Sequence, residues 1–238
     1  MGGFNDKLNG AKILIKCLKE LNVDTIFGYP GGAVLPIYDA LYYEEDINHI
    51  LTAHEQGAAH AADGYARVTG KVGVVLVTSG PGATNTVTGI ANAYRDSIPM
   101  VVFTGQVPQK QMGKAAFQEV DILSITKSIT KKNFLVKSID ELPTIVYEAF
   151  KVATEGRKGP VVVDIPKDIQ NTLVNDDFYY KNIYEIFNEM NCVENENLYK
   201  NIKEASLLIN KCKKPIIYAG GGIISSRSEE RRVGKECP

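Results

Sequence analysis

Glu55 is the acidic side chain whose place in the sequence most clearly suggests chemistry. It follows an apolar segment, 47–53, that is expected to form a strand, and it begins an alanine-rich segment, 55–69, that is expected to form a helix. Ligands of open α/β folds bind at the edge of the sheet where the strands end. A glutamate in the first turn of a helix is more often only a partner of the helix dipole, and position alone favours that second interpretation.

Three glycine-rich turns follow segments that suggest strands. They lie at 28–32, 80–82 and 220–222, and none has the GxGxxG pattern with a distal acid that marks dinucleotide sites. Glycine tolerates positive φ and lets a ligand approach the backbone closely, whereas the ordinary role of such a turn is to join a strand to a helix. Two of these turns fall within one domain, which favours a ligand role more than either turn does alone.

Other common catalytic patterns do not occur in the sequence. The histidines lack the spacing of a metal or hydrolase site, and there is no GxSxG elbow: they are His49, His54 and His60. The cysteines are scattered without a CxxC pair, which is typical of free thiols in a reducing compartment: they are Cys17, Cys192, Cys212 and Cys237. We therefore expect no metal ligands in this chain.

The composition restricts the class of partner. Lys and Arg total 27 against 28 Asp and Glu, so no strong field draws the chain to nucleic acid or to an anionic membrane. No apolar run approaches the roughly 20 residues that span a bilayer, and the first residues lack a signal-peptide pattern. We therefore expect a cytoplasmic protein whose partners include small molecules.

Strands and helices are expected to alternate along the first part of the chain. Apolar segments suggest strands at 25–28, 47–53, 72–77, 100–103 and 161–165, and helices are expected at 8–21, 34–43, 55–69 and 85–94. Continuous valine and isoleucine runs are typical of strands that are covered on both faces. The pattern predicts an α/β fold with a doubly wound, mostly parallel sheet in residues 1–170.

A second domain is expected to begin after a polar linker. Residues 171–197 are rich in Asn, Asp, Glu and Tyr, which is typical of a surface linker. Residues 198–225 suggest the start of a further α/β domain, with a helix at 198–210, a strand at 215–219 and the glycine turn at 220–222. Residues 226–238 are charged and almost without apolar side chains, so we expect an atypical tail that does not complete a domain.

Several longer motifs identify a family when they are taken together. FGYPGGAVLPIYDAL at 27–41, AHEQGAAHAADGYARVTG at 53–70, TSGPGATN at 78–85 and TGQVP at 104–108 resemble the catalytic large subunit of the acetohydroxyacid (acetolactate) synthases. The resemblance continues through AFQE, SITK and GPVVVDIPKDIQ and covers residues 8–225 in order. Another thiamine diphosphate-dependent decarboxylase, oxidase or carboligase is the alternative, and AFQE with Lys167 favours the synthase.

The resemblance implies a fold and a reaction. In this family a pyrimidine-binding α/β domain precedes a central FAD-binding domain and a domain that binds Mg²⁺ and diphosphate, so this chain would hold the first domain and the start of the second. The glutamate at the position of Glu55 hydrogen-bonds N1′ of the aminopyrimidine of thiamine diphosphate. Pyruvate is then decarboxylated and joined to a second 2-oxoacid, a step in isoleucine and valine biosynthesis.

The same resemblance assigns roles to individual residues. Catalytic roles fall on Glu55, Gln118, Phe117 and Gly32. Thiamine diphosphate contacts fall on Tyr29, Pro30, Gly31, Glu55, Thr78, Pro81, Asn85 and Gln118. A substrate channel would be lined by Ala33, Pro108, Ala116, Lys131 and Lys167, and FAD would be contacted by Arg157, Gly220, Gly221 and Gly222.

The resemblance also implies partners. Active sites of the family form across a dimer, so a second catalytic subunit is expected, in a homodimer or homotetramer, together with a regulatory subunit in some members. A chain without the diphosphate domain would supply half of each site, and we expect it to be inactive alone. A non-catalytic assembly domain is the interpretation from another class, and it differs in that it would bind no cofactor.

Overall fold

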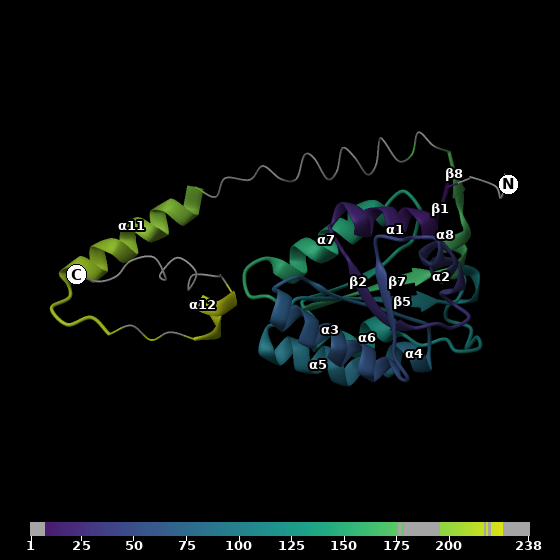
Figure 1. Cartoon of the computed structure of the whole chain (residues 1–238), viewed down its shortest axis with the longest axis horizontal. Helices are drawn as coiled ribbons and strands as arrows, with labels where there is room; N and C mark the ends of the chain where they lie inside the picture. The colour runs from purple at the N-terminus through teal and green to yellow at the C-terminus, as the bar shows by residue number, and fades with distance from the viewer. Residues whose placement is uncertain (1–7, 176–177, 179–195, 217, 219, 226–238) are drawn as a thin grey trace. The chain divides into compact units, whose positions relative to one another are not determined.

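A computed structural model describes residues 8–175, 178, 196–216, 218 and 220–225 (Figure 1). The chain divides into two compact units, Met1–Asn188 and Glu189–Pro238. Each unit is described here by itself. The first contains the sheet and the residues that the sequence suggests for chemistry.

The first unit is built on a six-stranded sheet in which every pairing is parallel. Its strands are β2 (Thr25–Tyr29), β3 (Asn48–Leu51), β4 (Gly73–Val77), β5 (Met100–Gln106), β6 (Lys132–Leu135) and β7 (Pro160–Pro166), in the spatial order β3-β2-β4-β5-β7-β6. The valine-rich strands β4, β5 and β7 are buried along their whole length. The predicted doubly wound parallel sheet is confirmed.

Helices cover both faces of this sheet (Figure 1). One layer holds α1 (Gly10–Glu20), α2 (Leu35–Tyr42), α7 (Leu142–Thr154) and α8 (Lys167–Asn171), and the other holds α3 (Glu55–Thr69), α4 (Pro81–Thr84), α5 (Val87–Asp96) and α6 (Ile122–Thr126). Successive residues of a strand point to opposite faces. Accordingly Leu76 joins the first hydrophobic cluster, whereas its neighbours Val75 and Val77 join the second.

The helix α3 packs closely on α5 and thereby fixes the position of Glu55. The small residues allow this approach: a Cβ built on Gly89 of α5 would lie 2.4 Å from Cβ of Ala59 on α3. The helix begins where the His54 ring accepts a hydrogen bond from the Gln56 amide, 3.1 Å away, and it ends at Gly70 with φ of 72°. Its first residue, Glu55, therefore lies directly after β3.

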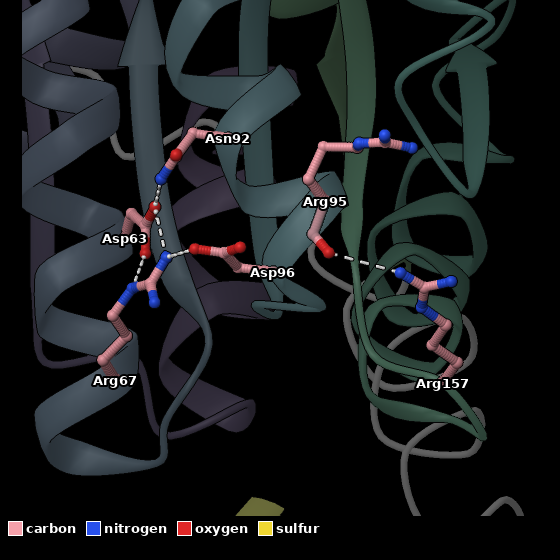
Figure 2. A network of polar contacts seen from close by, with 6 residues as sticks. All are labelled: Asp63, Arg67, Asn92, Arg95, Asp96 and Arg157. Atoms are coloured by element: carbon pink, nitrogen blue, oxygen red, sulfur yellow. Dashed lines mark hydrogen bonds and ion pairs between the residues drawn. The ribbon is translucent and has the colours of Figure 1, made fainter. Parts of the chain in front are cut away.

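A polar network joins the two helices on the side away from the core (Figure 2). The buried carboxylate of Asp63 on α3 accepts hydrogen bonds from Arg67, one turn further on, and from Asn92 of α5. Arg67 also bonds Asp96 of α5 at 2.6 Å. Neighbouring carboxylates raise the pKa of the Arg67 guanidinium, chiefly through the bond to Asp63. Hydrogen bonds between charged and polar side chains therefore hold α3 against α5, in addition to the close packing of their small residues.

The structure contains elements that the sequence did not predict. The expected helix 85–94 corresponds to α5, and the short helix α4 before it was not predicted. Residues 107–159 hold a short 3₁₀ turn, η1 (Gln109–Gln111), followed by α6, β6 and α7. A further antiparallel pair joins β1 (Leu8–Asn9) to β8 (Leu173–Val174). The first unit therefore extends past residue 170, and most of the expected linker, 176–177 and 179–195, lies outside the described residues.

The second unit is described through two helices, α11 (Glu196–Lys211) and α12 (Gly221–Ser225). The expected helix at 198–210 corresponds to α11. The expected strand at 215–219 is wrong where it is described, because residues 215, 216 and 218 have no strand partner and the side chains of Ile216 and Tyr218 are exposed. The predicted tail, 226–238, lies outside the described residues.

No helix in the described ranges is both long and apolar enough to cross a membrane. The described cysteines are free thiols: Cys17 is buried in the core of the first unit, and Cys212 is exposed directly after α11. Burial raises the pKa of the Cys17 thiol, so it is a packing group rather than a nucleophile.

Candidate active site

Three loops and the first turn of α3 meet at the carboxyl edge of the sheet. The loops follow β2 (residues 30–34), β4 (78–80) and β5 (107–121), and all three of these strands run in the same direction. Ligands of open α/β folds bind at this edge. The arrangement brings together residues that lie far apart in the sequence.

Glu55 is the acidic group at the centre of this edge. Its side chain is buried, with 9% of the residue exposed, and its Oε2 accepts a hydrogen bond of 2.9 Å from Nδ2 of Asn85. No described residue donates to the other oxygen, Oε1, which lies 3.3 Å from the place that a Cβ on Gly82 would occupy. One carboxylate oxygen is thus anchored, and the other is left for a ligand.

The charge of Glu55 affects the pKa of Tyr38. Its hydroxyl donates to the carbonyl of Leu76 at 3.1 Å, beneath the carboxyl edge. Burial raises the pKa of Tyr38, and the nearby Glu55 carboxylate raises it further. Tyr38 therefore stays protonated and acts as a hydrogen-bond donor to the sheet.

The loop after β2 is held against the loop after β4. A Cβ on Gly31 would lie 2.5 Å from Cβ of Thr78, so only glycine allows this contact. The Thr78 hydroxyl accepts from the Ala33 amide at 3.2 Å, and the Ala33 carbonyl accepts from Gln170 at 2.8 Å. Gly32, which lies between Gly31 and Ala33 in the sequence, faces open space, with no atom within 4 Å of an added Cβ. A ligand has room beside Gly32.

The loop after β5 covers the third side of the edge. Gly80 has φ of 60°, and a Cβ built on it would lie 2.6 Å from the carbonyl oxygen of Gln118. Gln118 itself has φ of 56°, a left-handed conformation that is uncommon outside glycine. The neighbouring Phe117 is 86% exposed. The backbone of Gln118 thus rests on Gly80 and presents two side chains at the edge.

Most of the predicted contact residues share this edge. Tyr29 and Pro30 are exposed at the end of β2, and Pro81 is exposed at the start of α4. The predicted channel residues Pro108, Ala116 and Lys167 also follow strands at this edge, and Lys167 is the first residue of α8. Their location agrees with the predicted roles, which themselves stay predictions.

Lys131 is not brought to this edge, and its place in a substrate channel stays a prediction. It precedes β6, where its amide bonds the carbonyl of Pro160 at 2.8 Å, at the opposite, amino edge of the sheet. Its ammonium donates to carbonyls at the end of α7, those of Val152 and of Glu155 at 2.6 Å. Lys131 therefore caps a helix.

The residues predicted to contact FAD do not form a described site. Arg157 lies in the turn before β7, where its guanidinium bonds Ser97 at 2.8 Å. It also donates to the carbonyl of Arg95 at 3.3 Å (Figure 2). The glycines of the second unit have no atom within 4 Å of an added Cβ: they are Gly220, Gly221 and Gly222. Their role toward FAD stays a prediction.

Sequence reasoning missed a buried polar cluster under the loop after β5. Asp164 lies within the apolar run of β7, and its carboxylate accepts from Thr104 at 2.7 Å and from Gln106 at 2.9 Å. Burial raises the pKa of Asp164 to about 7 despite these two hydrogen bonds. An acid inside a run of buried valines was the available signal, because unpaired carboxyl groups are rarely buried.

Comparison with known proteins agrees with the motifs and the fold. Residues 8–125 match the family described as thiamine pyrophosphate enzyme, N-terminal TPP binding domain. The chain is 50% identical over 221 residues to the mitochondrial acetolactate synthase catalytic subunit of Saccharomyces cerevisiae, covering 92% of this chain and 32% of that protein.

Two bacterial relatives give the same result. The acetolactate synthase large subunit of Buchnera aphidicola subsp. Schizaphis graminum is 53% identical over 237 residues, covering 97% of this chain and 41% of the relative. The acetolactate synthase large subunit of Corynebacterium glutamicum is 49% identical over 227 residues, covering 94% of this chain and 35% of that relative. The chain thus spans between about a third and two fifths of the length of these relatives. It belongs to the thiamine pyrophosphate enzymes and carries their N-terminal binding domain.

Proposed function

We propose that the carboxyl edge around Glu55 holds the aminopyrimidine ring of thiamine diphosphate, and that the chain serves as the N-terminal part of an acetolactate synthase. The observation that carries the proposal is the buried Glu55 carboxylate, which has one oxygen bound by Asn85 and the other facing Gly82. A ring nitrogen that shares a proton with Glu55 would complete its hydrogen bonding. This is the role that the family resemblance assigns to Glu55.

The shape of the site fits a flat ring. A side chain on Gly82 would meet Thr78 and Glu55, and Gly32 in the loop after β2 faces open space. Backbone groups of residues 29–31, at and directly after the end of β2, would line the approach. When it is bound, thiamine diphosphate supplies the nucleophilic carbon and the electron sink for decarboxylation. The chain would bind and orient the ring, hold the proton at Glu55 and exclude water.

The loop after β5 and the start of α8 would receive the substrate. Phe117 is exposed, and Gln118, which rests on Gly80, is half-buried. Lys167 begins α8 on the same edge. A lysine ammonium suits the carboxylate of a 2-oxoacid such as pyruvate. Pro108, Ala116 and Ala33 would form the walls of the channel.

Further cofactors and partners are proposed from the length of the relatives. Because the chain spans 32% of the yeast protein and 41% of a Buchnera protein, the remaining length would provide the sites for Mg²⁺, the diphosphate and most of FAD. The relatives are named catalytic or large subunits, which supports a separate regulatory subunit beside a second catalytic subunit. The products would serve isoleucine and valine synthesis.

Binding of thiamine diphosphate to the chain tests the proposed role of Glu55. Glu55→Gln should weaken the affinity by about tenfold or more, because it replaces a charge-assisted hydrogen bond. Glu45→Gln, a change of the same kind at an exposed residue before β3, should leave the affinity unchanged. Isothermal titration calorimetry measures both. Equal affinity of the wild-type chain and Glu55→Gln, or no binding at all, would contradict the proposal and favour a non-catalytic assembly domain.

A further inference from the structure

One side chain closes both ends of the loop after β5. Gln106 is the last residue of β5, and 3% of it is exposed. Its Oε1 accepts from the amide of Val107 at 2.9 Å, and its Nε2 donates to the carbonyl of Val120 at 3.0 Å. Both ends of the segment 107–120 are thus hydrogen-bonded to the same side-chain amide group, that of Gln106.

Asp164 determines which way this amide faces. Its Oδ2 accepts from Nε2 of Gln106 at 2.9 Å, and its Oδ1 accepts from the Thr104 hydroxyl at 2.7 Å. The carbonyl of Val120 cannot donate, and neither can Asp164 in its ionised form, so a reversed Gln106 amide would set its oxygen against the Val120 oxygen. Reversal would also leave the Val107 amide without an acceptor. The observed orientation is therefore the one that satisfies every polar atom of the cluster.

A second clamp holds the tip of the same loop. The Glu119 carboxylate accepts from the amide of Ala116 at 2.8 Å and from that of Gly113. These backbone hydrogen bonds lower the pKa of Glu119. Between the clamps the chain takes positive φ at Ala115 and Gln118. Such conformations persist only where the surroundings hold them in place.

We propose that Gln106, oriented by Asp164, is a positioning residue that fixes Phe117 and Gln118 above the Glu55 edge. The interaction is buried and therefore little screened by water. It does not touch the ligand and acts through the backbone of residues 107–120. The identity of that ligand rests on the proposed function, whereas the ordering of the loop does not.

A purely structural role would have a different outcome from a positioning role. If the cluster only contributed to the core, its loss would lower the stability of the whole first unit and leave the folded loop unchanged. If Gln106 holds the loop, its loss should release residues 107–120 while the sheet stays folded. Local opening of this kind is measured separately from global unfolding.

Two variants in the same buried cluster separate these roles. Gln106→Met keeps the length of the side chain and removes the bonds to Val107, Val120 and Asp164. Thr104→Val removes one hydrogen bond to Asp164 and touches neither end of the loop. Asp164→Asn can still accept from Gln106 through its oxygen and donate to Thr104, so it should keep the loop closed.

The loop contains two exposed trypsin sites, Lys110 and Lys114, and the chain has no tryptophan. Trypsin cleavage after these lysines in native buffer, identified by mass, should be roughly tenfold or more faster in Gln106→Met. Thr104→Val and Asp164→Asn should be cleaved there at the wild-type rate. With Phe117→Trp as the only tryptophan, fluorescence anisotropy should fall in the Gln106→Met background alone.

Several outcomes would overturn the proposal. They are equal cleavage of Gln106→Met and wild type, equal acceleration by Thr104→Val, or unchanged anisotropy of the tryptophan. If Gln106→Met does not fold, the isosteric Gln106→Glu replaces it, since it keeps an acceptor for Val107 and has no donor for Val120 when ionised. Added thiamine diphosphate should protect the wild-type loop, and failure of that step alone contradicts the proposed function and leaves the positioning role of Gln106 standing.

Discussion

At the scale of single residues, two buried carboxyl groups of the first unit differ in their surroundings. Glu55 lies at the edge of the sheet with one oxygen free of described donors, whereas Asp164 lies inside the sheet with both oxygens bound. The first arrangement is suited to a ligand, and the second to holding a loop. The sequence indicated the first through its place after a strand, but the second depends on two side chains of β5 that only the parallel pairing brings beside Asp164.

Asp164 should make the stability of the unit depend on pH in an unusual direction. Its pKa is raised from about 3.8 to about 7 by burial, so between these values the folded chain holds a proton that the unfolded chain releases. The free energy of unfolding should therefore fall, by roughly a few kcal/mol, as pH rises from about 4 to about 7. Carboxylates with lowered pKa values, such as Asp24 at about 2, act in the opposite direction.

Urea unfolding at several pH values measures this effect. Asp164→Asn stays neutral, so the difference in unfolding free energy between it and the wild type should grow as pH rises through this window. A difference that is independent of pH would show that Asp164 is ionised in the folded state throughout.

At the scale of elements, the strongest predictions concerned segments with a single clear pattern. The valine-rich strands and the alanine-rich helix α3 were predicted nearly to their observed bounds. The strand β6, with the sequence KNFL, has no apolar run and is set by its pairing with β7. The same pairing places Lys131, which directly precedes β6, at the amino edge of the sheet. The expected strand at 215–219 is not formed at its described residues, 215, 216 and 218, since an apolar run alone does not supply a strand partner.

The contact between α3 and α5 gives a prediction at this scale. Gly89→Ala should destabilise the unit by about 1–3 kcal/mol, because its Cβ would meet Cβ of Ala59 at 2.4 Å. Gly64→Ala on α3 has no atom within 4 Å of the new Cβ, and it should stabilise the unit by about 0.5–1 kcal/mol through helix propensity. Urea denaturation of both variants is the measurement. Destabilisation by Gly64→Ala of the same size would refute the argument from packing.

At the scale of the whole molecule, the proposed function makes the chain one side of a site. The predicted pyrimidine contacts gather at a single edge of the first unit, and among the described residues no group of His, Cys, Asp and Glu could hold a metal ion. The Mg²⁺ and diphosphate contacts would have to come from elsewhere in the assembly. The sequence could predict this division only through the family resemblance, since composition does not reveal where a missing half of a site lies.

The proposed division predicts the activity of the chain by itself. Incubated with pyruvate, thiamine diphosphate, Mg²⁺ and FAD, the chain should form no acetolactate, because the proposed sites for Mg²⁺ and diphosphate lie in the part of the relatives that this chain does not span. Product analysis by NMR is the measurement, and Glu55→Gln is the control. Turnover by the wild-type chain above that control would contradict the need for a second half-site.

The position of β3 has a consequence for handling the protein. Among the described residues β3 pairs with β2 alone, so one row of its peptide groups faces outward, and its last residue, Leu51, is 62% exposed. An open strand edge with apolar side chains is a template for pairing with another chain. The isolated unit should therefore self-associate as its concentration rises, and a lysine at position 51 should delay the onset of turbidity. The border of the sheet, rather than its interior, would then limit how concentrated a preparation can be.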